Sequence, residues 1–239
     1  MRKKIIEEAR IVVQDSAAVS LLVLLITFAV GLGILRFVSW RDPESDYVAM
    51  GTLMGMMVVA ALELFGGSRM LMNDFNRAVG FGRTRKSFLI SRLVVEYGIY
   101  LGLFLVIRLW SEAETWIGGM WFRDGLAMDI RFWLGGLHLV LYPFLLLGIK
   151  TCCAGLLMRY FQMAQLFMTV LWCVAVIGLP QMMDAVEEAP NSVWGILGRG
   201  IVKVVGETTQ AAGYLVMAAV GIVTLAAGVG MLRRQRVTV

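Results

Sequence analysis

The sequence predicts an all-α integral membrane protein with six transmembrane helices, and two observations lead to this fold class. First, 59% of the 239 residues are hydrophobic and the mean hydropathy is +0.77. A soluble domain of this size could not bury so much apolar surface. Second, charged residues make up 16% of the chain, against roughly 25% in soluble domains. We therefore expect residues 1–239 to form a single transmembrane domain.

The chain begins with a segment that is amphipathic rather than uniformly apolar. Residues 1–15 place Ile5, Ile6, Ala9 and Val12 on one helical face and most charged residues on the other. This pattern predicts a helix that lies on the membrane surface, and a solvated cytoplasmic tail is the alternative. The apolar run that follows is too long for the core of a signal peptide, so we expect no cleavage.

Six apolar runs are long enough to cross a bilayer. The predicted spans cover residues of about 17–38, 48–65, 87–107, 132–158, 163–179 and 211–232. The second contains Gly51-x-x-x-Gly55, which allows close helix approach, and internal packing is the favoured interpretation. The boundary between the fourth and fifth spans is open, because Lys150 and Arg159 could each mark the inner surface.

Two segments outside the spans are predicted to lie on the outer side. Residues 108–131 carry tryptophans and acidic residues and are expected to form a partly apolar interfacial loop. Residues 181–208 form an extracytoplasmic segment with a short amphipathic helix, capped by Asn191 or Ser192. With this threading, most of the 22 Lys and Arg residues share a side with both termini. The positive-inside rule then places both termini in the cytoplasm.

No motif of an enzyme active site is present. The chain has no Gly-x-Ser-x-Gly, no His-Glu-x-x-His and no phosphate-binding Gly-x-x-x-x-Gly-Lys-Ser/Thr, so we expect neither catalysis nor a cofactor bound by this chain. Cys152, Cys153 and Cys173 lie in or near apolar runs and are expected to be free, buried thiols. No cluster with metal-ligand spacing occurs.

Ionisable groups within membrane spans are functional candidates, and four of those in the predicted spans are singled out. They are Glu63, Arg92, Glu96 and His138. Glu63 and Arg92 lie at matching depths, and an inter-span clamp between them is favoured over a proton path. His138 is the only histidine, and a neutral imidazole that bonds to a neighbouring helix is favoured over a catalytic role.

The densest basic segment of the chain, residues 66–86, follows the second span. Gly80 and Gly82 permit a sharp bend, and Arg69 and Phe75 precede it with a mixed basic and apolar face. Contact with anionic lipid, nucleic-acid binding and protein docking are the three interpretations. The segment lacks the interleaved aromatics of a nucleic-acid surface, so we expect no nucleic-acid partner.

Residues 75–88 read Phe-Asn-Arg-Ala-Val-Gly-Phe-Gly-Arg-Thr-Arg-Lys-Ser-Phe. This segment resembles the one that follows the second span in bacterial permeases of the ABC type-2 exporter-like class, and the layout of nearly the whole chain is similar to theirs. The resemblance implies a permease subunit of an ABC transporter in the bacterial cytoplasmic membrane. It implies an exporter of an apolar or amphipathic substrate, such as a drug, a peptide or a lipid-like molecule.

The same resemblance implies the partners. A second permease chain, identical or paralogous, would pair with this one, and separate ATPase subunits would bind ATP and Mg and dock on residues 66–86. The residues implied in this coupling loop are Arg69, Phe75, Asn76, Arg77, Gly80, Gly82, Arg83, Thr84, Arg85 and Lys86. Charge reversal at Arg83 or Arg85 is then expected to abolish ATPase association.

Two functions from other classes are compatible with the sequence. One is an ATP-independent membrane interaction protein, such as an immunity or sensor subunit, which would keep the basic segment and purify without an ATPase. The other is a proton-coupled carrier that uses His138, Glu63 and Glu96. Transport that is insensitive to neutralisation of these three residues would exclude the carrier.

Overall fold

The described part of the chain is built of helices, six of which are long and apolar enough to cross a membrane. The computed structural model describes residues 17–45, 47–123, 130–178, 181, 191–207 and 209–234, so the predicted surface helix at 1–15 lies outside the described residues. The six segments are α2 (Ala18–Arg41), the run of α3 (Met50–Ala61), η2 (Leu62–Gly67) and α4 (Ser68–Gly80), α5 (Arg85–Trp121), α6 (His138–Arg159), α7 (Phe161–Cys173) with η4 (Val174–Gly178), and α10 (Gln210–Arg234). The helical fold class is confirmed at this level.

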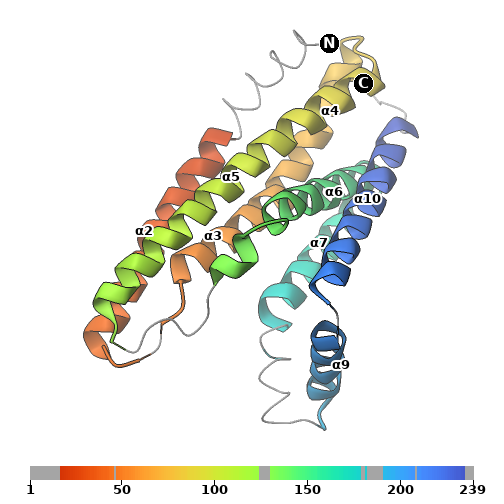
Figure 1. The fold of residues 1–239 in the computed structure, drawn as a ribbon. Coiled ribbons are helices and arrows are strands. Elements are labelled where there is room, and N and C mark those ends of the chain that lie inside the picture. Colours follow the sequence, from red (N-terminus) through yellow and green to blue (C-terminus); the bar gives the residue numbers. More distant parts are fainter. Residues whose placement is uncertain are drawn as a thin grey trace.

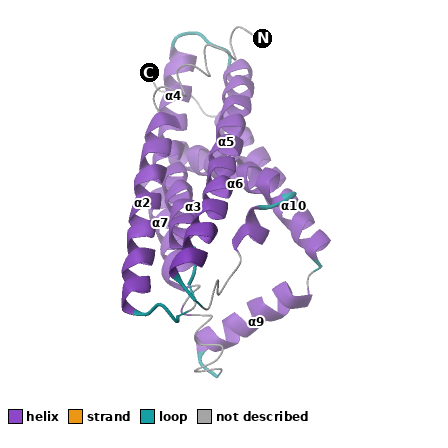
Figure 2. Ribbon diagram, turned by 60° about the vertical axis from the view of Figure 1, so that its left-hand side comes forward, coloured by secondary structure: helices purple, strands orange, loops and turns teal. Residues whose placement is uncertain are grey.

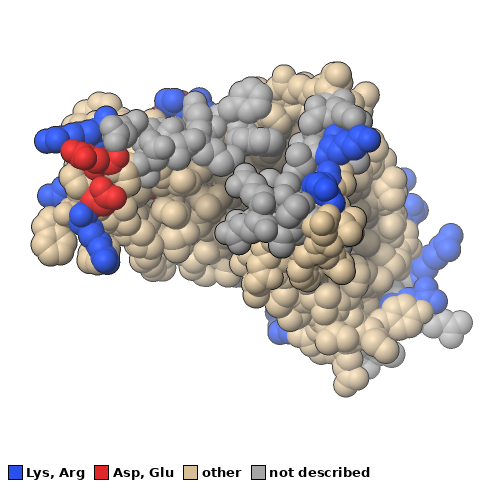
Figure 3. Space-filling view, turned by 90° about the horizontal axis from the view of Figure 1, so that it is seen from below, with Lys and Arg blue, Asp and Glu red and all other residues tan. Residues whose placement is uncertain are grey.

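Successive long helices alternate in direction (Figures 1 and 2). The turn between α4 and α5 lies at the same end as the end of α10, and the connection between α2 and α3 lies at the opposite end. Helices α2, α3 and α5 pack together, while α6 packs against α10 and α7. Seen from below in Figure 3, acidic and basic side chains gather at the corner formed by the α2–α3 connection, and most of the remaining described surface is uncharged.

Two helices continue beyond the predicted span ends, through charged residues. The second span was expected to end near residue 65, but the helix continues through η2, a π-helical turn, to Gly80. The third was expected to end near residue 107, yet α5 runs to Trp121 and replaces most of the predicted interfacial loop. Several charged side chains in these extensions are paired: Arg108, for example, lies 2.6 Å from Glu112 one turn later, and Asp74 lies 3.0 Å from Arg92. Charges that are satisfied within the fold do not end a helix.

The later elements begin and end near the predicted positions. A short 3-10 helix, η3 (Ile130–Leu134), precedes α6, which begins at His138 and ends at Arg159. The connection between α6 and α7 is a single residue, Tyr160, so the α6 helix continues past Lys150 and ends at Arg159. The predicted short helix of the outer segment is α9 (Val193–Glu207), and Ser192 Oγ accepts a hydrogen bond from Gly195 N at 3.0 Å, as expected of a cap.

Glycines set the approach of α2 to α3. A Cβ atom on Gly31 would overlap the backbone of Gly51, and one on Gly55 would lie 2.7 Å from the ring of Phe28. The Gly51-x-x-x-Gly55 pattern therefore marks internal packing, as predicted. Phe28 also stacks on Trp110 of α5, with ring centroids 4.5 Å apart. These contacts form the core of the α2, α3 and α5 group.

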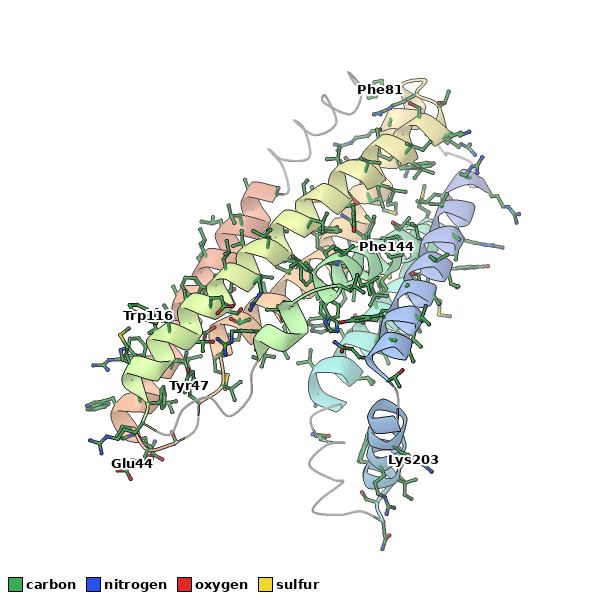
Figure 4. The ribbon with its side chains drawn as sticks, in the orientation of Figure 1. Glu44, Tyr47, Phe81, Trp116, Phe144 and Lys203 are labelled. Atoms are coloured by element: carbon green, nitrogen blue, oxygen red, sulfur yellow. The ribbon has the colours of Figure 1, made fainter. Side chains whose placement is uncertain are left out.

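A second glycine seam joins α6 to α10. Gly148 and Gly155 of α6 face Gly221 and Gly228 of α10, and the ring of Phe144, labelled in Figure 4, covers Gly221. We expect Gly228→Ala to lower the free energy of unfolding by about 2 kcal/mol, a typical cost of overpacking. A Cβ at this position would lie 2.5 Å from Cys152 N.

The matched control for this substitution lies half a turn away on the same helix. Gly230→Ala should be nearly neutral, because a Cβ built there meets nothing within 4 Å. Thermal unfolding of the detergent-solubilised protein measures both variants. A loss at Gly230 as large as that at Gly228 would show that helix propensity, rather than the α6–α10 seam, determines the effect.

Candidate functional site

A buried cluster of charged residues joins η2, α5 and α6 through their side chains. Lys150 of α6 lies at its centre, with Nζ 3.0 Å from Glu63 Oε2 and 3.0 Å from Glu96 Oε1. Lys150 Nζ also donates to the Tyr100 hydroxyl at 2.7 Å, and that hydroxyl donates to Glu63 Oε2 at 2.5 Å. Each of these four side chains is at most 8% exposed. Paired in this way, the charges avoid the cost of facing lipid alone.

Arg92 extends the cluster toward α4. Its Nε donates to Glu96 Oε1 at 2.8 Å, and its Nη2 lies 3.0 Å from Asp74 Oδ2 on α4. The sequence predicted a clamp between Glu63 and Arg92, but the cation paired with Glu63 at 3.0 Å is Lys150. A clamp between helices is therefore present, but its cation is Lys150, which the sequence left open as one of two possible marks of the inner surface.

The π-helical turn η2 gives Glu63 its place in the cluster. Insertion of one extra residue in a turn shifts the helix face, and π-helical turns occur frequently at functional sites. A Cβ on Gly67 would overlap the Glu63 carboxylate and lie 3.0 Å from Lys150 Nζ, so only glycine fits there. A cavity of about 210 Å³ lies beside the cluster, lined by Glu63, Arg92 and Lys150 and by residues of α2, η2 and α4.

The structure places the predicted coupling residues on α4, on the turn after it and at the start of α5. Phe75 is fully buried and packs edge-on against Phe88 of α5, with ring centroids 5.8 Å apart. Arg69 and Arg77 are exposed on α4, while Asn76 is partly buried. Gly80 ends α4. The predicted loop is therefore mainly a helix anchored by Phe75.

The turn itself occupies residues 81–84. Gly82 has φ +81°, a backbone conformation that L side chains rarely adopt. Phe81 precedes it with 91% of its surface exposed and projects from the end of the molecule (Figure 4). Thr84 caps α5 by accepting a hydrogen bond from Ser87 N at 3.4 Å, and Lys86 is exposed. Phe81 is exposed in this turn but was not among the coupling residues expected from the sequence.

The two arginines chosen for charge reversal make contacts within the chain. Arg83 Nη2 donates to Ser91 Oγ at 2.5 Å, and its guanidinium lies over the Phe88 ring at 5.4 Å. Arg85 Nη1 donates to the Arg233 carbonyl at 2.8 Å, which satisfies a backbone acceptor at the end of α10. Substitution of either residue would therefore disturb the α5 and α10 ends as well as any surface.

His138 lies apart from the charge cluster. It is 5% exposed at the start of α6, between Tyr142 and Tyr214, with ring centroids 5.4 and 4.7 Å away. Twelve residues of α6 separate it from Lys150, about 18 Å along a helix. The fold therefore does not bring His138, Glu63 and Glu96 together into a single proton relay. The contact with Tyr214 of α10 places the imidazole against a neighbouring helix.

Glu114 is a buried carboxylate in the segment that was expected to be an outer loop. It is fully buried on α5, and its Oε1 and Oε2 accept from Gly51 N and Thr52 N at 2.6 and 2.7 Å. Glu114 thus caps the first turn of α3 from another helix. Beside it, Tyr47 donates to the Thr115 carbonyl at 2.9 Å, and burial raises the pKa of the Tyr47 phenol, which keeps it a donor.

The cysteines supply no site among the described residues. All three thiols are free, as expected, but Cys173 is exposed rather than buried. The described residues contain no group of His, Cys, Asp or Glu that could hold a metal ion.

Several members of the buried cluster carried a signal in the sequence. Lys150 interrupts an apolar run, which by itself marks an intramembrane charge. Asp74 and Tyr100 carried no such signal, because only the packing of α4 and α5 brings them to Arg92 and Glu63. With this geometry described, comparison of the chain with protein-family models, with curated proteins and with solved structures found no match.

Proposed function

We propose that this chain is the membrane-spanning permease subunit of an ABC transporter, and that separate ATPase subunits dock on α4 and the turn that follows it. The observation that carries the proposal is the exposed Phe81, which is flanked along the chain by the exposed basic residues Arg77 and Lys86. An aromatic side chain with neighbouring basic residues is a typical protein-docking anchor. The resemblance of residues 75–88 to ABC type-2 permeases supplies the partner.

The packing of α4 supports transmission of force to the spans. Leu71 and Phe75 of α4 form one buried cluster with Phe88 of α5, Ala154 of α6 and Leu232 of α10. The ion pair between Asp74 and Arg92 adds a polar tie between α4 and α5. A partner that moves α4 would therefore move three spans with it, as rigid bodies.

The proposed protein is an exporter of an apolar or amphipathic substrate in the bacterial cytoplasmic membrane, with both termini in the cytoplasm. Two permease chains would enclose the substrate path, and ATP with Mg would bind only to the partner ATPase. The exposed apolar side chains of the helices support the membrane location, and the exposed basic residues Arg69, Arg77 and Lys86 near the α4–α5 turn support this orientation.

We expect the double variant Phe81→Ala and Arg77→Ala to reduce recovery of the ATPase at least about tenfold, since hot-spot residues each contribute about 2 kcal/mol. The measurement is co-purification in mild detergent after expression with the neighbouring genes, followed by an ATPase assay. Phe81 and Arg77 are better targets than Arg83 and Arg85, because the latter two bond within the chain.

The matched control is a double variant at the opposite end of α5, Trp116→Ala with Arg123→Ala. Trp116 is 70% exposed and the Arg123 side chain is 77% exposed, so this pair removes a similar aromatic and cationic surface. Retention of the ATPase by the Phe81 and Arg77 variant would contradict the docking site. A wild-type chain that purifies alone, without ATP turnover, would favour the ATP-independent interaction protein.

A further inference from the structure

An open groove runs along the last turns of α10, beside the end of α6. It has a volume of about 610 Å³ and is lined by Arg159, Ala226, Ala227, Gly230, Met231 and Arg234. The Arg85 contact to the Arg233 carbonyl places this groove at the same end of the molecule as the α4–α5 turn. The groove shares no lining residue with the buried charge cluster around Lys150 or with the exposed Phe81, so it is a separate feature of the molecule.

The groove combines two guanidinium groups with an apolar floor. Arg159 ends α6 and Arg234 ends α10, both are exposed, and none of the carboxylates in the described residues forms an ion pair with either of them. Guanidinium groups bind phosphate with two parallel hydrogen bonds. Two of them at the ends of neighbouring spans therefore favour an anionic phosphate group at the level of the membrane headgroups.

The apolar floor continues from the arginines toward the middle of α10. Ala226, Ala227 and Gly230 leave the space open, since a Cβ on Gly230 would meet nothing within 4 Å. Val223 lies one helical turn before Ala226 and Ala227, is 66% exposed and extends the apolar floor. From residue 234 to residue 223 a helix rises about 17 Å, close to the roughly 15 Å hydrocarbon depth of one leaflet.

We propose that this groove binds one anionic phospholipid, with its phosphate between Arg159 and Arg234 and an acyl chain along the small residues of α10. Charge complementarity favours this occupant over a second copy of the chain. A two-fold contact centred on the groove would bring four guanidinium groups together, because an isologous interface pairs the same surface with itself. The proposal requires only that the protein lies in a membrane, so it does not depend on an ATPase partner.

Native mass spectrometry of the full chain in detergent, titrated with phosphatidylglycerol or phosphatidylcholine, tests the proposal. We expect tighter binding of phosphatidylglycerol. The double variant Arg159→Gln and Arg234→Gln should weaken it about thirtyfold, because each basic side chain near an anionic lipid contributes about 1 kcal/mol. The control variant Arg69→Gln with Arg233→Gln removes two other basic side chains at this end that do not line the groove.

A second variant tests the apolar half with the charges intact. Gly230→Leu places a side chain in the groove from a position where a Cβ would meet nothing within 4 Å, and it should weaken phosphatidylglycerol binding. Gly213→Leu, at the start of the same helix and equally open at the Cβ position, should not. Unchanged binding in both groove variants would overturn the proposal. It would also fail if glycerol phosphate competed as well as the intact lipid, which indicates a soluble-anion site, or if cysteines placed at residue 230 cross-linked two copies.

Discussion

Replacing Lys150 with Met should lower the free energy of unfolding by about 3–5 kcal/mol, the range typical of removing one partner from a buried ion pair. Met keeps most of the apolar volume of the lysine stem, so the change removes mainly the charge. Glu63 and Glu96 would then lose the cation that lies 3.0 Å from each of them. The Tyr100 hydroxyl would also lose a donor at 2.7 Å.

Reversible unfolding in mixed detergent and SDS measures this loss. Lys203→Met is the matched control, because Lys203 lies exposed on α9 and its replacement should change stability by less than about 0.5 kcal/mol. Combining Lys150→Met with Glu63→Gln should cost less than the sum of the two single losses, since the double variant removes an opposite pair. Equal losses for Lys150→Met and Lys203→Met would contradict the clamp.

The same cluster shows which parts of the site can be inferred from the sequence. Glu63, Arg92 and Glu96 interrupt apolar runs. Because an unpaired charge within the membrane is energetically costly, the sequence identifies these residues and predicts that they are paired. The identity of each pair depends on which helices meet. Lys150 reaches Glu63 because α6 packs against η2, and η2 is a π-helical turn that no simple periodicity predicts.

The fold, like the site, can be predicted from the sequence only in part. Apolar runs are sufficient to locate six helices of spanning length, because the membrane requirement for length and hydropathy is local. The ends of α4 and α5 also depend on contacts far apart in the sequence. Beyond the expected ends, Asp74 pairs with Arg92 of another helix, and Glu114 accepts hydrogen bonds from the backbone of α3. Phe75 and Phe81 make the point within one segment: both are aromatic neighbours of basic residues, yet packing against Phe88 buries only the first.

Replacing Glu114 with Ala should lower the free energy of unfolding by about 3 kcal/mol, since a buried donor that loses its acceptor costs about 1 kcal/mol or more. The carboxylate accepts three hydrogen bonds at the start of α3, from the backbone amides of Gly51 and Thr52 and from the Thr52 hydroxyl. Ala49, at the N-cap position of α3, provides no side-chain cap of its own. Glu114→Gln keeps one acceptor oxygen and should cost about half as much.

Glu112 provides a control on the same helix. Its carboxylate is 47% exposed and pairs with Arg108 and Arg131 at the surface, so Glu112→Ala should cost less than about 1 kcal/mol. Hydrogen exchange should locate the difference, with faster exchange at Gly51 and Thr52 in the Glu114 variant and unchanged exchange in α10. Equal losses of stability in the two alanine variants would contradict the cap on α3. The loss would then come from removing a negative charge from α5, and another group would have to stabilise the first turn of α3.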